Sequence, residues 1–308
     1  MIRFTMPSSS LCREEQIANL KSQFNDFMSS DALSDICRLL GTDAYSIAEK
    51  INPRKVSNRI IEVQLAHTDS SLESLRYDLY PLFRELGFLD INEPVSNGHT
   101  RIVVLGGSLN ACFLRAYAAA DYLTDNVISA DAISCYRPIN PVERSSSSFE
   151  SVFDTEFGVM SDAMSSAFGL DGINYTDDFV SDRNLNGISC IRTFDKSASG
   201  CMHKNFAAPS LEPDIRRADT FDSIDFYLKK QALTDSERLL FVTNNVYCNR
   251  QFLQLAFGFI SLDEIFDFDI IGCSKGDKIA SADAYNVPLY VSELTGTIDW
   301  IKRFCSEL

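Results

Sequence analysis

The stretch RIVVLGGSLNACFLRAYAAADYL, residues 101–123, decides the fold class of this chain. Its first five residues are mostly apolar and β-branched, which is typical of a buried strand. Gly106 and Gly107 follow, and the next residues are rich in alanine and leucine, which favour a helix. A strand that enters a helix through a glycine turn is the basic unit of α/β proteins, whose ligands bind beyond the carboxyl ends of the strands.

The same alternation continues along the rest of the chain. Short apolar runs predict strands at 101–105, 131–136, 188–194, 205–209, 239–243, 268–272 and 287–291. Helices are predicted at 111–123, 155–168, 214–229, 247–259 and 292–304. The polar residues 169–187 are interpreted as a long insertion. Strands that alternate with helices in this way predict a mostly parallel sheet covered on both faces.

The N-terminal third has a different pattern. Apolar residues recur there at helical spacing, including those of the segment 60–65. The segment INEPVSNGHT at 91–100 combines proline, asparagine and glycine, which is typical of a linker. We therefore expect a helical extension over residues 1–95 and an α/β domain over residues 96–308.

Composition narrows the class of partner. The 308 residues include 43 acidic and 28 basic ones, for a net charge of −15, which disfavours binding to nucleic acid and to anionic membranes. The nine cysteines form no CxxC pair, which predicts reduced thiols and a cytoplasmic location. No apolar run is long enough for a secretory signal or a membrane span, so we expect a soluble protein without a membrane span, while export by machinery that reads other signals stays open.

Polar residues follow the ends of the predicted strands. Because the carboxyl ends of parallel strands meet at one edge of a sheet, we expect these residues to form a single site. Gly106 and Gly107 would let the backbone approach a ligand closely, and N–H groups at the following helix start suit an anion. Four arginines are candidates to bind the negative charge of that ligand. They are Arg115, Arg137, Arg217 and Arg250.

Glu156 and Arg137 are the candidate catalytic residues. Glu156 begins a predicted helix, where its carboxylate could act as a general base or orient a hydroxyl group. Arg137 lies just past a strand end and suits bidentate binding of phosphate or carboxylate. Each candidate also has an ordinary interpretation as a turn residue, a helix cap or a surface ion pair, which the sequence leaves open. The remaining ligand-binding candidates are Ser108, Asn110, Thr220, Asn244 and Asn245.

Four segments, LGGSLNACFLR, TEFGVM, RRADT and FVTNNVYCNRQ, occur in an order that resembles the SanA/YdcF-like family, domain of unknown function 218. The resemblance covers about residues 100–273. It implies a Rossmann-like three-layer sandwich that binds nucleotide-like or phosphorylated ligands, including S-adenosylmethionine for some members. Where many relatives carry a histidine in the late turn, this chain has NNVYC at 244–248, which puts histidine-dependent acid/base chemistry in doubt. The implied site residues are Gly106, Gly107, Arg115, Glu156, Thr220, Asn244 and Arg250.

These observations favour an enzyme that transfers or hydrolyses a group of a small anionic ligand. No set of metal ligands is predicted, although a phosphorylated ligand could bring a divalent cation with it. A cysteine hydrolase that uses Cys112, or Cys201 with His203, is a competing hypothesis. So is a non-catalytic binding protein, including a secreted effector, that contacts a protein partner through residues 1–95.

Overall fold

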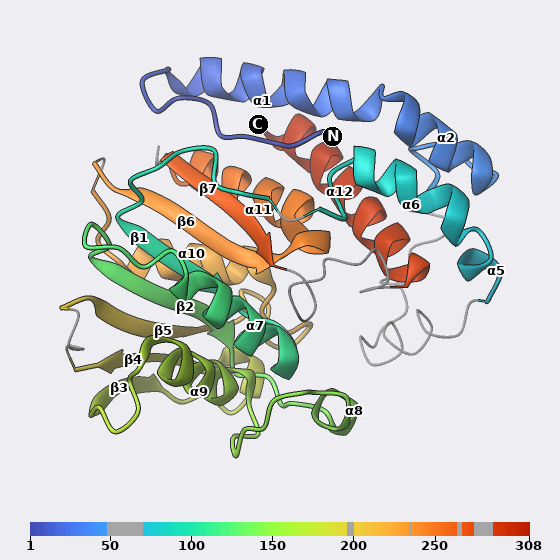
Figure 1. Ribbon diagram of the computed structural model, residues 1–308. Coiled ribbons are helices and arrows are strands. Elements are labelled where there is room, and N and C mark those ends of the chain that lie inside the picture. The colour runs from blue at the N-terminus through green and yellow to red at the C-terminus, as the bar shows by residue number, and fades with distance from the viewer. Residues whose placement is uncertain (48–69, 91, 196–199, 235, 264–266, 274–285) are drawn as a thin grey trace. The chain divides into compact units, whose positions relative to one another are not determined.

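The computed structural model describes residues 1–47, 70–90, 92–195, 200–234, 236–263, 267–273 and 286–308 (Figure 1). The chain forms two compact units. One comprises Met1–Asn92, Asn245–Glu264 and Ser274–Leu308, and the other comprises Glu93–Asn244 and Ile265–Cys273. Two later segments that the sequence assigns to the α/β domain thus group by their contacts with the N-terminal helices.

The second unit contains a seven-stranded, mostly parallel sheet. Its strand order is β3-β4-β5-β2-β1-β6-β7, as Figure 1 shows. The five strands from β5 to β7 in this order run parallel, and β4 and β3 are antiparallel additions at one edge. The protein is therefore of the α/β class. The strands are β1 (Arg101–Leu105), β2 (Ser129–Cys135), β3 (Tyr175–Val180), β4 (Ser189–Phe194), β5 (Met202–Ala208), β6 (Arg238–Asn244) and β7 (Asp267–Cys273).

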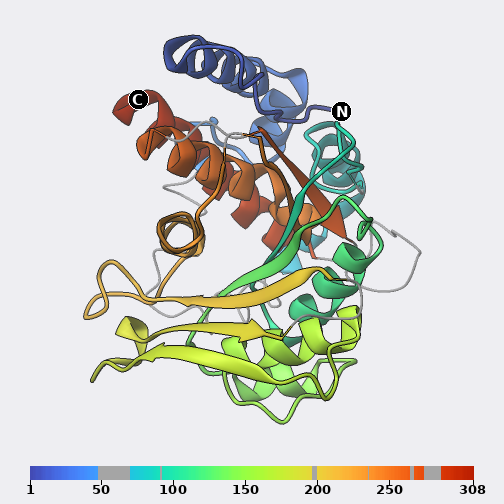
Figure 2. The ribbon, with the colours of Figure 1, turned by 90° about the vertical axis from the view of Figure 1, so that its left-hand side faces the viewer.

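Helices of this unit cover both faces of the sheet (Figure 2). On one face, α7 (Leu109–Ala120) and α9 (Glu156–Phe168) pack in an apolar cluster with Ile102 and Val104 of β1. On the other face, α10 (Thr220–Lys230) contacts β2 and β5. Every residue of β1 and β2 is buried, which explains why RIVVL is a continuous apolar run instead of an alternating one.

The face of the sheet that α10 covers carries a buried polar network. Asp131 of β2 is fully buried and accepts hydrogen bonds from Ser129 Oγ at 2.6 Å and from the Tyr227 hydroxyl of α10 at 2.9 Å. Arg101 of β1 lies 3.6 Å from Asp131 and is also paired with Glu237. Burial raises the pKa of Asp131 above its ordinary value, whereas its hydrogen bonds and the charge of Arg101 oppose that shift.

The other unit is built from helices. Among the described residues, these helices are α1 (Arg13–Met28), α2 (Asp31–Leu39), α5 (Ser70–Glu73), α6 (Arg76–Glu85), α11 (Cys248–Ser261) and α12 (Val287–Glu307). Aromatic rings fill the core of this unit: Phe24 packs edge-on against Phe4 at 5.3 Å and against Phe304 at 5.0 Å, between ring centroids. Within the described part of the chain, no helix has the length and hydropathy needed to cross a membrane.

Three sequence predictions about single elements need correction. The run VPLYV at 287–291 is not a strand but the first turn of α12, because the Asn286 side chain caps the helix by accepting from Leu289 N and Pro288 suits its first turn. α10 begins at Thr220 instead of 214, because Asp219 and Asp222 form a capping box. The insertion 169–187 contains β3. The predicted helical segment 60–65 lies outside the described residues.

Removal of the Tyr227 hydroxyl should destabilise the protein. The Tyr227→Phe variant leaves the buried Asp131 carboxylate with one donor fewer, and we expect the free energy of unfolding to fall by about 1–3 kcal/mol. Urea unfolding measures the loss. The control is Tyr117→Phe, which removes an exposed hydroxyl bonded to Ser166 and should change stability by less than about 0.5 kcal/mol. Equal losses in the two variants would contradict the role of the network.

Candidate functional site

The glycine turn after β1 makes room for two side chains. A Cβ atom at position 106 would overlap Glu156 Oε1 and would lie 2.9 Å from the Ile133 carbonyl oxygen. A Cβ atom at position 107 would lie 3.2 Å from Arg115 Nη1. Neither glycine has a positive φ, so close approach and not backbone strain accounts for both. Gly106 N donates to Ile133 O at 2.7 Å, so this N–H is already bonded to the neighbouring strand.

Arg115 of α7 binds the backbone of this turn. Its side chain is buried, with 2% of the residue exposed, and is not part of a surface ion pair. Nη1 donates to the carbonyl oxygens of Leu105, at 2.9 Å, and Gly106, and Nε donates to Asn244 Oδ1 at the end of β6 at 2.7 Å. Arg115 therefore joins the carboxyl ends of β1 and β6, and the two predicted site residues Arg115 and Asn244 lie together.

Arg137, just beyond β2, uses all five of its N–H donors within the protein. Nε donates to Glu156 Oε2, and one hydrogen of each terminal nitrogen goes to a carbonyl: Nη1 to Pro138 at 3.2 Å and Nη2 to Gly107 at 2.6 Å. The other two bond the carboxylate of Glu143 at 2.8 and 3.2 Å. Burial by itself would lower the pKa of Arg137, but the charges of Glu156 and Glu143 outweigh it and raise that pKa.

Glu156 is the first residue of α9, as the sequence predicts, and is 6% exposed. The Thr155 side chain caps this helix by accepting from Gly158 N at 3.2 Å. The Glu156 carboxylate accepts from Arg137 Nε and, at 3.7 Å, from Cys135 Sγ. An ion-paired carboxylate in this position orients Arg137, and its action as a general base stays a prediction.

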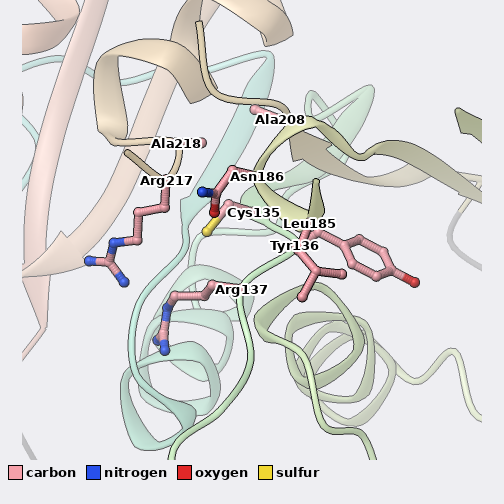
Figure 3. Close-up of a pocket in the computed structure, with 8 residues that line it drawn as sticks. All are labelled: Cys135, Tyr136, Arg137, Leu185, Asn186, Ala208, Arg217 and Ala218. Carbon is pink, nitrogen blue, oxygen red and sulfur yellow. The ribbon is translucent and has the colours of Figure 1, made fainter. Parts of the chain in front are cut away.

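A small, open pocket lies beside Arg137 at the ends of β2 and β5 (Figure 3). It is lined by Cys135, Tyr136, Arg137, Leu185, Asn186, Ala208, Arg217 and Ala218. Figure 3 shows the guanidinium groups of Arg137 and Arg217 extended toward the same side, whereas the Tyr136 ring points away from both. This pocket brings two of the predicted arginines together.

Arg217 differs from the other arginines of the site. It is half-buried, and no hydrogen bond or ion pair reaches its guanidinium from the residues that the structure describes. The segment that carries it is nevertheless fixed, because Arg216 donates to the Arg217 carbonyl at 3.2 Å and is itself paired with Asp222 and Glu212. The opposite wall is fixed by Asn186, whose Nδ2 donates to Pro213 O at 3.0 Å.

Several predicted site residues have structural roles. The Ser108 hydroxyl caps α7 by accepting from Ala111 N at 3.4 Å, and Asn110 Oδ1 accepts from Ser148 N and Oγ at 3.2 Å. Thr220 is the first residue of α10, directly after the capping residue Asp219.

Two predicted site residues belong to the other compact unit. Arg250 of α11 is buried and donates from Nε to Glu293 Oε2 of α12 at 2.6 Å, and from Nη1 to Gln254 Oε1 at 3.2 Å. Asn245 donates to the Leu89 carbonyl. Both residues therefore have partners within the helical unit, and their predicted contact with a ligand stays a prediction.

Sequence reasoning missed two residues that shape the site. Glu143 lies on the short helix α8 (Pro141–Ser145), which the sequence analysis did not predict. The pattern N-P-V-E at 140–143 is a helix-start signal that could have predicted α8. In the structure Asn140 caps this helix and donates from Nδ2 to Glu143 Oε1 at 3.0 Å. Asn186 had no comparable signal, because it reaches the pocket from the loop between β3 and β4.

The structure disfavours cysteine chemistry. The Cys112 thiol is buried and donates to Gly107 O at 3.7 Å, and burial raises its pKa to about 12. Burial likewise raises the pKa of Cys201 to about 11 and lowers that of His203. A nucleophile needs the thiolate, so neither site is poised for attack. Among the described residues, no three His, Cys, Asp or Glu side chains are grouped to hold a metal ion.

Comparisons with protein-family models, with curated proteins and with solved structures find no match to this chain.

Substitution of Gly106 and of Gly107 by alanine should destabilise the protein to different extents. In Gly106→Ala the new methyl group collides with the Glu156 carboxylate and a strand carbonyl, so we expect a loss of about 1–3 kcal/mol in the free energy of unfolding. Gly107→Ala meets only the Ala111 methyl group, at 3.0 Å, and the Arg115 side chain, and should cost less. Thermal or urea unfolding of both variants measures the difference, and the reverse order would contradict this account of the turn.

Alkylation should separate exposed from buried thiols. With a pKa of about 12, roughly one Cys112 thiol in ten thousand is ionised at pH 8. We expect iodoacetamide at that pH to modify the exposed Cys12 and Cys305 and to spare Cys112 in the folded protein. Peptide mass spectrometry measures the labelling, and modification of Cys112 as fast as that of Cys12 would revive the cysteine-hydrolase hypothesis.

Proposed function

We propose that the protein binds a small phosphorylated or nucleotide-like anion in the pocket at the ends of β2 and β5. The observation that carries this proposal is Arg217, a half-buried arginine on a fixed segment that faces the same pocket as Arg137 and has no partner in the described part of the chain. A guanidinium at the edge of a pocket with no carboxylate partner among the described residues is available to an anionic ligand.

The chemistry of the pocket supports a phosphate group. Guanidinium groups bind phosphate oxygens through parallel charge-assisted hydrogen bonds, which are about twice as strong as neutral ones. The two small residues Ala208 and Ala218 leave space between the polar walls. On a chain with a net charge of −15, Arg217 supplies a positive charge that no carboxylate of the described residues offsets.

We also propose a reaction class and a family for this protein. Group transfer or hydrolysis is the reaction class that the sequence predicts, with Arg137 oriented by Glu156 toward the ligand. The parallel sheet with helices on both faces is compatible with a Rossmann-like sandwich of the SanA/YdcF-like type. S-adenosylmethionine is then one of the ligands to be tested, with its carboxylate in the place of the phosphate.

Substitution of Arg217 tests the proposed binding site. Arg217→Ala removes one cationic contact but no protein hydrogen bond of the described chain, so we expect the melting temperature to stay within about 2 °C. Affinity should fall about tenfold or more, because one hydrogen bond to a charged group contributes about 1.5–3 kcal/mol. Isothermal titration with adenosine monophosphate, ribose 5-phosphate, inorganic phosphate and S-adenosylmethionine measures the effect.

Two controls accompany this titration. Adenosine lacks the anionic group and should bind at least tenfold more weakly than its monophosphate. Arg183→Ala removes the same charge from an exposed position outside the pocket lining and should leave affinity within about twofold. If no member of the panel binds the wild-type protein, or if Arg217→Ala binds as tightly as wild type, the proposed site is wrong.

A further inference from the structure

The bonds of Arg137 fall into two groups. Three of its N–H groups are held by fixed partners: the Glu156 carboxylate at the start of α9 and the carbonyls of Gly107 and Pro138. The remaining two, one on each terminal nitrogen, bond the two carboxylate oxygens of Glu143. The first group fixes the plane of the guanidinium, and the second is a bidentate pair of the kind that a phosphate also forms.

Glu143 is the partner that can be exchanged. It belongs to α8, a five-residue helix in which no residue is buried. Besides Arg137, its carboxylate bonds only Asn140, its own capping residue, among the described residues. Glu156, in contrast, is 6% exposed and begins a 13-residue helix that packs on the sheet. An incoming anion can displace Glu143 without disturbing the core, but it cannot displace Glu156 so easily.

We propose that Glu143 occupies the place of the ligand's phosphate on Arg137 and must leave when the ligand binds. This inference rests on the proposed function and adds the docking atoms, Nη1 and Nη2 of Arg137, and a competing group within the chain. A phosphate carries about −1.5 to −2 charge at pH 7, whereas Glu143 carries −1, and the phosphate can also contact Arg217. The ligand class that replaces Glu143 is therefore a phosphate with at least two free oxygens.

Removal of the competing carboxylate should tighten phosphate binding. In Glu143→Gln only one amide oxygen remains to accept from Arg137, and the amide NH₂ opposes the other N–H group. We expect the dissociation constant for inorganic phosphate to fall about tenfold relative to wild type at pH 7.5, as measured by isothermal titration. Glu150→Gln removes an exposed carboxylate from the same loop and should leave the constant within about twofold.

The outcomes separate this inference from the proposed function. Tighter binding in Glu143→Gln, lost again in Glu143→Gln/Arg217→Ala, supports both. Equal binding by wild type and Glu143→Gln, with loss in Arg217→Ala, keeps the proposed site and overturns the competition. If neither wild type nor Glu143→Gln binds phosphate, the competition is overturned. The proposed function is overturned as well only if the other ligands of the panel also fail to bind the wild-type protein.

A structure of the wild-type protein with inorganic phosphate gives a second test that needs no variant. We expect phosphate oxygens at Nη1 and Nη2 of Arg137, with the Glu143 side chain turned away and the bond from Arg137 Nε to Glu156 intact. Phosphate bound in the pocket while Glu143 still pairs with Arg137 would overturn the inference and leave the proposed binding site in place.

Discussion

The buried ion pair between Arg137 and Glu156 is the contact on which the rest of the site depends. It joins the end of β2 to the first turn of α9, directly beside the turn that follows β1. The two side chains are only 12% and 7% exposed, so each would be costly to leave without the other. The pair explains the glycine at position 106, because only a residue without a Cβ leaves space for the Glu156 carboxylate.

The arginines of the sheet unit share a charge but not a role. Arg115 donates to strand carbonyls and an asparagine side chain, and therefore acts as a brace for the strand ends. Arg137 is fixed by Glu156 and two backbone carbonyls and donates its two remaining N–H groups to the Glu143 carboxylate. Arg217 faces the pocket without a partner in the described chain. The three arginines therefore differ in their hydrogen-bond partners as well as in their burial, and Arg115 is the most buried of the three.

The two faces of the sheet are packed differently. The face under α7 buries an apolar cluster that includes Val104 of β1, whereas under α9 the buried Asn205 of β5 donates to the Phe157 carbonyl and to the Ser161 hydroxyl of that helix. The face under α10 buries the Asp131 carboxylate together with hydrogen-bond donors from Ser129 and Tyr227. These bonds fix how α10 packs on β2, although the carboxylate loses its contact with water. The pocket beside Arg137 lies at the strand ends, where loops replace regular structure.

The sequence by itself determined the local elements and their class. The runs at 101–105 and 239–243, and the helix that begins at Glu156, follow from short-range composition and capping, so alternation along the chain was enough to predict an α/β sheet. Apolar runs were ambiguous where capping went unnoticed, as at 287–291, because strands and buried helix starts share the same residues.

Only the tertiary structure decided the partners of the charged groups. Nothing in the sequence distinguishes Arg137, which pairs with Glu143 and Glu156, from Arg217, which has no such partner in the described chain, or from Arg250, which pairs with Glu293 in the helical unit. Pairing depends on which side chains the packed elements bring within hydrogen-bond distance, and that distance is not encoded in periodicity. Local sequence therefore determines most of the strands and helices. The candidate site forms only when segments that are distant in the sequence pack together.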